Sequence, residues 1–122
     1  MLYSKEVIKY YKKVPEAMVL WPDDETDVIT LSSGSYSAGE YVIFQFKLNK
    51  KQQIIDCRYQ VLGCGYMIAL VSWFVEAVHK KHINQLSKIN ISTINQVFDL
   101  PQTKRHCALT LLSLIEKIEK SC

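Results

Sequence analysis

The stretch Val61-Leu62-Gly63-Cys64-Gly65-Tyr66 lies where the sequence changes from one hydrophobic period to another. Before it, apolar and polar residues alternate, as is typical of a strand; after it, nearly every residue is apolar, as is typical of a buried helix. Two glycines leave the backbone free to bend around Cys64, and a helix N-terminus favours a thiolate. The stretch predicts a strand-to-helix joint with a functional cysteine. The alternative is a small buried hydrophobic residue beside a turn.

Three strands are predicted upstream of this joint, over Val28–Ser35, Glu40–Leu48 and Ile54–Leu62. The short turns between them require antiparallel pairing. Alternation puts Val42, Phe44, Phe46 and Leu48 on one face of the second strand and Gln45 and Lys47 on the other. On the third strand it puts Ile55, Cys57, Tyr59 and Val61 on one face, which is interpreted as the core face, with Cys57 as a core residue.

In the order of the sequence, one helix is predicted before the strands and the others after them. They cover residues 5–11, 66–80, 93–98 (capped by Ser92) and 104–120, with a shorter segment over residues 83–89. Residues 14–27 are expected to form an irregular connection. The order of elements predicts an α+β fold, in which helices pack on one face of a three-stranded antiparallel sheet. Without a break in composition or a repeat, residues 1–122 are expected to form a single domain.

The composition narrows the classes of function. The chain has 122 residues, a net charge of +3, and only two arginines, so nucleic acid is not an expected partner. The longest apolar stretch, residues 66–78, is too short to span a bilayer, and the start lacks the layout of a signal peptide. These features predict a cytoplasmic protein without a membrane partner, whose four cysteines are reduced thiols.

A second group of candidate ligands opens the last predicted helix, where His106 precedes Cys107. Adjacent residues on a helix can reach one metal only near its start, where the geometry is looser. Together with Cys64 they form an N/S set suited to zinc or iron. Glu40, at the start of the second strand, could supply an oxygen as fourth ligand, or could be an ordinary edge-strand glutamate.

The candidate ligands and the motifs around them follow one another in an order that is typical of a known protein family. Tyr3-Ser4 opens the first helix, Ala38-Gly39-Glu40 starts a strand, Gly63-Cys64-Gly65 precedes the central helix, and Leu100-Pro101 leads to Lys104-Arg105-His106-Cys107. Over nearly its whole length the chain resembles the NifU/IscU-type iron–sulfur cluster assembly scaffold proteins. The resemblance implies an exposed site of three cysteines, an aspartate and a histidine, where a cluster is built with sulfur from a cysteine desulfurase and passed on with help from an Hsp70-type chaperone. Some members hold zinc there.

The chain departs from that family at two ligand positions and in one longer stretch. Ala38 replaces the first cluster cysteine, Glu40 replaces the aspartate, and the chaperone-recognition stretch is altered to Leu100-Pro101-Gln102-Thr103-Lys104. The ligands that remain are Glu40, Cys64, His106 and Cys107, which suit zinc or iron, and any [2Fe–2S] cluster on Cys64, His106 and Cys107 is expected to be labile or absent.

Three functions therefore stay open. The first is a divergent metal-binding scaffold that is not an enzyme. The second is a SufE-like persulfide carrier that uses Cys64 or Cys107. The third is a regulatory protein that binds a desulfurase and builds no cluster.

Overall fold

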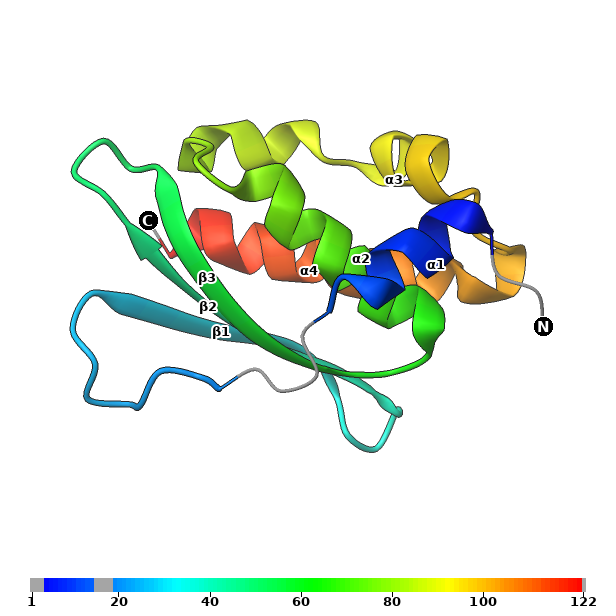
Figure 1. Cartoon of the computed structure of the whole chain (residues 1–122), viewed down its shortest axis with the longest axis horizontal. Coiled ribbons are helices and arrows are strands. Elements are labelled where there is room, and N and C mark those ends of the chain that lie inside the picture. Colours follow the sequence, from blue (N-terminus) through cyan, green and yellow to red (C-terminus); the bar gives the residue numbers. More distant parts are fainter. Residues whose placement is uncertain (1–3, 15–18, 122) are drawn as a thin grey trace.

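The computed structural model describes residues 4–14 and 19–121 and confirms the α+β class (Figure 1). Its elements are α1 (Lys5–Lys12), β1 (Val28–Ser35), β2 (Glu40–Leu48), β3 (Ile54–Leu62), α2 (Gly65–Val78), the 3-10 helix η1 (Ile83–Lys88), α3 (Ile91–Phe98), the 3-10 helix η2 (Gln102–Lys104) and α4 (Arg105–Lys120). In the part of the chain that the structure describes, no helix is long and apolar enough to cross a membrane.

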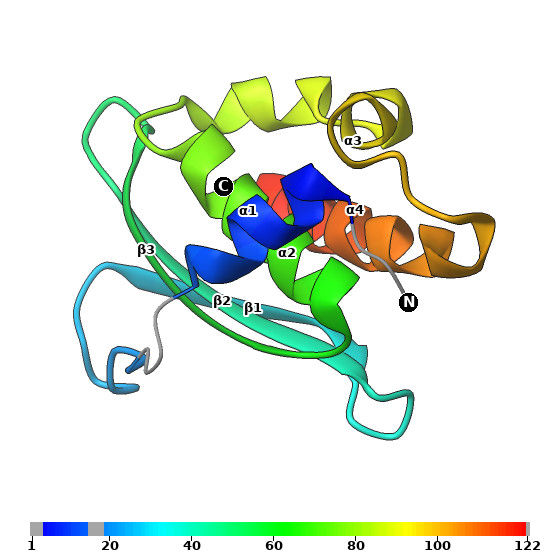
Figure 2. The same ribbon diagram turned by 45° about the vertical axis from the view of Figure 1, so that its right-hand side comes forward.

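The sheet is antiparallel in the order β1-β2-β3, so β2 is the middle strand. The helices lie on one side of it, as Figures 1 and 2 show from two directions. The register pairs Tyr41 with Leu62, so Glu40 at the start of β2 lies beside the end of β3. The sheet thereby brings Glu40 close to the strand-to-helix joint that carries Cys64.

The helix α2 fills the centre of the core, as its apolar sequence predicts. Nine of its fourteen residues are buried, and they pack over the inner face of the sheet, where Val42, Phe44 and Phe46 are fully buried. The last helix, α4, is tied to β1 by polar contacts as well: the Ser33 hydroxyl donates to the carbonyl of Thr110 over 3.0 Å. This contact fixes the start of α4 relative to the sheet.

Two local predictions are wrong. Ile55 was expected to face the core, but it is 44% exposed and Ile54 is fully buried instead. The reason is a shift of register between Lys47 and Leu48, which leaves one residue of β3 unpaired and reverses the alternation at that end. In the other case, α3 begins at Ile91, because Asn90 rather than Ser92 caps it by accepting a hydrogen bond from the amide of Thr93.

The outer face of the sheet is also partly covered, which the alternation in β2 does not predict. Gln45 points away from the helices, yet it is only 3% exposed. Its side-chain amide accepts from the backbone N–H of Trp21 over 2.6 Å and donates to the Trp21 carbonyl over 3.0 Å. The Trp21 ring lies under the side chains of Lys47 and Arg58. The part of the predicted irregular connection around Trp21 is thus fixed against the outer face of the sheet and covers it.

Replacing Gln45 with alanine is expected to lower the free energy of unfolding by about 1–3 kcal/mol, because both backbone groups of Trp21 lose their partner while still partly buried. The measurement is urea unfolding followed by tryptophan fluorescence. Thr30→Ala is the control, since Thr30 only accepts a longer, 3.3 Å bond from Gln45 and leaves the contacts to Trp21 intact. Equal losses in the two variants would contradict the role given to Gln45.

Candidate metal centre

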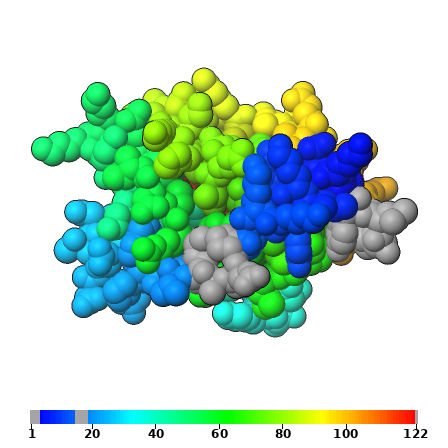
Figure 3. Space-filling view, viewed as in Figure 1, coloured from blue at the N-terminus to red at the C-terminus, as the bar shows by residue number. Residues whose placement is uncertain are grey.

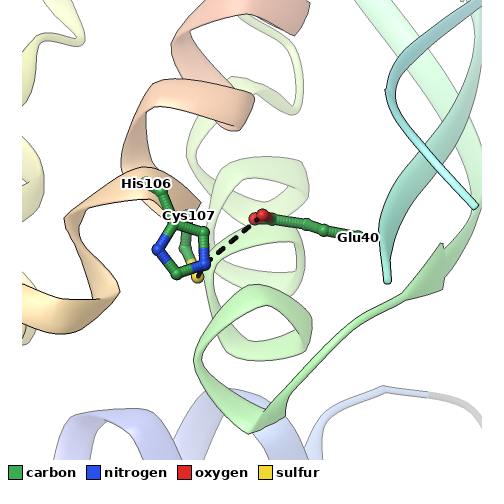
Figure 4. Close-up of side chains that lie close together, drawn as sticks. All are labelled: Glu40, His106 and Cys107. Carbon is green, nitrogen blue, oxygen red and sulfur yellow. Dashed lines mark hydrogen bonds and ion pairs between the residues drawn. The ribbon is translucent and has the colours of Figure 1, made fainter. Parts of the chain in front are cut away.

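Three separate elements bring the four predicted ligand residues to one end of the molecule. Glu40 is the first residue of β2, Cys64 is the N-cap of α2, and His106 and Cys107 lie in the first turn of α4. Figure 4 shows the carboxylate of Glu40 extending from the sheet toward the imidazole of His106. The side chains of Glu40, His106 and Cys107 therefore meet at one place, with Cys64 beside Cys107, although the sequence separates Glu40 from Cys107 by more than half its length.

The donor atoms are close enough to share one ion. The distance from Glu40 Oε2 to His106 Nε2 is 3.5 Å, and that from His106 Nε2 to Cys107 Sγ is 3.7 Å. One ligand atom from each of these three residues lies within 4.8 Å of the other two. Cys64 joins the group through Cys107, with the two sulfur atoms 3.9 Å apart.

Two groups of the centre, the Glu40 carboxylate and the Cys107 thiol, would gain from a nearby cation. Glu40 Oε1 is buried and has no hydrogen-bond partner among the described residues, which is costly for an acceptor unless a hydrogen-bond donor or a cation satisfies it. Cys107 is fully buried, and this burial, together with the nearby Cys64 and Glu40, raises the pKa of its thiol far above the usual range. Both groups would be stabilised by a metal ion among them.

The backbone around Cys64 leaves its sulfur available. The residue is extended, with φ −74° and ψ 173°, and its side chain makes no capping hydrogen bond. The preceding residue must be glycine, because a Cβ on Gly63 would come within 2.9 Å of the Cβ of Met67, which is fully buried. The structure thus confirms the strand-to-helix joint, and it turns the Cys64 sulfur toward Cys107 rather than toward the helix backbone.

Gly34, which the sequence analysis overlooked, supports Glu40 from the neighbouring strand. Gly34 has φ +83°, and a Cβ there would clash with the carbonyl oxygen of Glu40. A glycine inside a predicted strand is the signal that could have identified it, since such glycines often mark a close approach of backbones.

Replacing Gly34 with alanine is therefore expected to displace the start of β2 and to lower the free energy of unfolding by about 3 kcal/mol or more, through left-handed strain plus the clash. Gly39→Ala is the matched control: Gly39 also has a positive φ, +71°, but open space around it. It should lose only about 1–2 kcal/mol. The measurement is thermal and urea unfolding of both variants; equal losses would contradict the importance of the close approach to Glu40.

Other predicted features lie outside this cluster. The interpretation of Cys57 as a core residue is confirmed only in part: it is half-buried on β3 opposite Phe46 and packs against the core, and burial raises the pKa of its thiol to about 12. Ala38 is exposed in the turn between β1 and β2. Leu100 is only 6% exposed, so the stretch from Leu100 to Lys104, which the resemblance relates to chaperone recognition, begins with a core residue.

Comparison with known proteins places the chain in a family. Residues 2–118 match the family model described as NifU-like N terminal domain. The chain is 32% identical to the iron–sulfur cluster assembly scaffold protein IscU of Buchnera aphidicola subsp. Acyrthosiphon pisum over 109 residues, which are 89% of this chain and 85% of the relative. It is 30% identical to the iron–sulfur cluster assembly enzyme IscU of Drosophila melanogaster over 88% of this chain and 70% of that one.

A solved structure has a similar fold. It is that of an iron–sulfur cluster assembly scaffold protein for the SUF system from Fervidobacterium islandicum AW-1, with a TM-score of 0.66, 16% identity and 93% of each chain covered. At that identity the likeness concerns the fold alone. The family model and the IscU relatives carry the assignment: this chain belongs to the NifU-like N-terminal domain family.

Proposed function

We propose that this protein is an iron–sulfur cluster assembly scaffold whose divergent site holds a single zinc or iron ion through Glu40, Cys64, His106 and Cys107. The role as scaffold follows the names of the IscU relatives. The observation that favours ion binding is the spacing of donor atoms around the unpartnered oxygen of Glu40.

Three of the distances between donor atoms resemble edges of a tetrahedron. With bonds of about 2.3 Å to sulfur, 2.05 Å to nitrogen and 2.1 Å to oxygen, a tetrahedral zinc ion separates its ligands by about 3.4 Å for N and O, 3.6 Å for S and N, and 3.8 Å for two sulfurs. The corresponding distances here are 3.5, 3.7 and 3.9 Å. Glu40, His106 and Cys107 would need only small movements to hold an ion, whereas Cys64, which contacts Cys107 but lies outside this group of three, would have to turn its sulfur toward the ion.

An assembled cluster is the cargo of such a scaffold, and here it would be held weakly. A [2Fe–2S] cluster is usually bound by four thiolates, and this site offers two, Cys64 and Cys107, because Ala38 has no donor. The thiol that contacts His106, Cys107, is fully buried and its pKa is raised, so it is a poor nucleophile toward a substrate. We therefore propose binding and transfer of the cargo, without turnover chemistry of the protein itself.

The partner that this function requires is a source of sulfur, and we propose a cysteine desulfurase. The Cys64 thiol, half-buried between two glycines, is the thiol of the site that such a partner could reach, since Cys107 is fully buried. An Hsp70-type chaperone would have to bind a stretch whose first residue, Leu100, lies in the core. Chaperone binding is therefore expected only when the end of α3 opens.

The test is titration of the reduced, metal-free protein with zinc, followed by elemental analysis after gel filtration. We expect about one equivalent to remain bound. Titration with cobalt gives a second readout, because thiolate-to-cobalt charge-transfer bands report sulfur ligands directly. Cys57→Ser is the control, since this half-buried thiol lies outside the cluster. Absence of stoichiometric zinc and of the thiolate bands would overturn the proposal.

A further inference from the structure

Two free thiols face each other within the centre. The sulfur atoms of Cys64 and Cys107 are 3.9 Å apart, whereas Cys57 lies on the sheet opposite Phe46. With alanine at position 38, Cys64 has Cys107 as its thiol neighbour. We propose that Cys64 and Cys107 are a modification site, at which oxidation forms an intramolecular disulfide that closes the centre to metal.

The local geometry favours closure of this gap. A disulfide requires the two sulfur atoms to approach to about 2.05 Å. Cys107 is held in the first turn of α4 and is fully buried, so it stays in place. Cys64 precedes α2, lies between two glycines, and has no capping bond to lose. A rotation of the Cys64 side chain, with adjustment of its glycine neighbours, brings the sulfurs together without unwinding either helix.

The exposure of the two thiols sets the order of the chemistry. Cys64 is half-buried and Cys107 is fully buried, so a small peroxide reaches Cys64 first. The Cys64 sulfur attacks hydrogen peroxide, which gives a sulfenic acid and one water molecule. The Cys107 sulfur then attacks that sulfenic acid, forming the S–S bond and releasing a second water molecule. Two thiols are oxidised by two electrons, one peroxide is reduced, and a dithiol reductant reverses the process.

The consequence for metal binding rests on the proposed function. The disulfide removes both thiolates and leaves Glu40 and His106, which is too few donors for a stable zinc site. Conversely, zinc on both sulfurs protects them from oxidation. Metal and disulfide are thus mutually exclusive states of the same two residues.

The experiment treats the reduced, metal-free, full-length protein with one equivalent of hydrogen peroxide, digests it with trypsin without reductant, and analyses the peptides by mass spectrometry. Each of the four cysteines falls on its own tryptic peptide: residues 52–58, 59–80, 106–117 and 121–122. We expect peptide 59–80 joined to peptide 106–117 with the loss of two hydrogen atoms, and denatured protein with two reactive thiols in place of four. Oxidised protein should bind zinc at least about 100-fold more weakly, and dithiothreitol should restore binding.

Two controls make the result decisive. Cys57→Ser should retain the cross-link, and Cys64→Ser should lose it. A cross-link to peptide 52–58 or 121–122, a disulfide between two copies of the chain, or overoxidation of Cys64 with Cys107 still reduced would each overturn the proposal. The peptide readout needs no metal: a cross-link in a protein that binds no zinc would refute the proposed metal site alone, whereas zinc binding without a cross-link would refute only the disulfide.

Discussion

Replacement of Cys107 by serine is expected to weaken zinc binding by at least about 100-fold, the largest effect of any single substitution at the centre. Cys107 is the hub of the donor set, because its sulfur lies 3.7 Å from His106 Nε2 and 3.9 Å from the sulfur of Cys64. A serine hydroxyl remains protonated at neutral pH and does not replace a thiolate. The measurement is competition for zinc against a chelator of known affinity.

The comparison variant for this experiment is Cys57→Ser. Cys57 and Cys107 are both thiols whose pKa is raised by burial, so the two substitutions disturb similar surroundings, but only one removes a proposed ligand. Circular dichroism and urea unfolding establish that each variant is folded. If Cys57→Ser weakened zinc binding as much as Cys107→Ser does, the loss would reflect general destabilisation and not ligation.

Zinc affinity of the wild-type protein should also increase with pH. The raised pKa of Cys107 means that its thiol carries a proton at neutral pH in the metal-free protein, and zinc must displace that proton to bind the thiolate. Each displaced proton changes the affinity by about tenfold per pH unit, so binding should strengthen steadily from about pH 6 to pH 8. An affinity that is independent of pH over this range would show that Cys107 is not a ligand.

The predictions that succeeded rest on patterns within a single segment, and those that failed depend on contacts between segments. Alternation correctly predicts the three strands, and the all-apolar stretch correctly predicts the buried α2, because one-sided and all-round burial leave different periods. The burial of Ile54 in place of Ile55 depends on a register shift opposite Leu48, and that shift is a property of two strands together. Trp21 is similar: its contact with Gln45 joins residues far apart in sequence.

The candidate ligands could be proposed from the sequence for a different reason. Glycines flank Cys64, and His106 precedes Cys107 at a helix start, so the residue types and their positions at element ends already narrow the chemistry. What the sequence lacks is the distance between elements. The contact of Glu40 with His106 follows from the pairing of β2 with β3 and from the anchoring of α4 on β1, and it decides whether Glu40 faces the centre or the solvent.

Restoring a thiol at position 38 is expected to have the second large effect: Ala38→Cys should lengthen the lifetime of a reconstituted [2Fe–2S] cluster several-fold, because a third thiolate joins Cys64 and Cys107. The substitution should cost less than about 0.5 kcal/mol of stability, since Ala38 is exposed in the turn between β1 and β2. The measurements are iron and sulfide content after anaerobic reconstitution, and the decay of visible absorbance after removal of excess reagents.

Ser37→Cys is the matched control for this prediction. Ser37 is an exposed neighbour in the same turn, and its hydroxyl lies 3.2 Å from that of Ser35, so a thiol at position 37 should stay within the turn and not reach the centre. Because Gly39 has φ +71° with open space around it, the turn can adjust to bring position 38 inward when a ligand is offered. A longer lifetime in Ala38→Cys alone would show that the site lost one ligand and kept the rest of its architecture. Equal lifetimes in both variants and the wild type would contradict the prediction that a thiol at position 38 joins the centre.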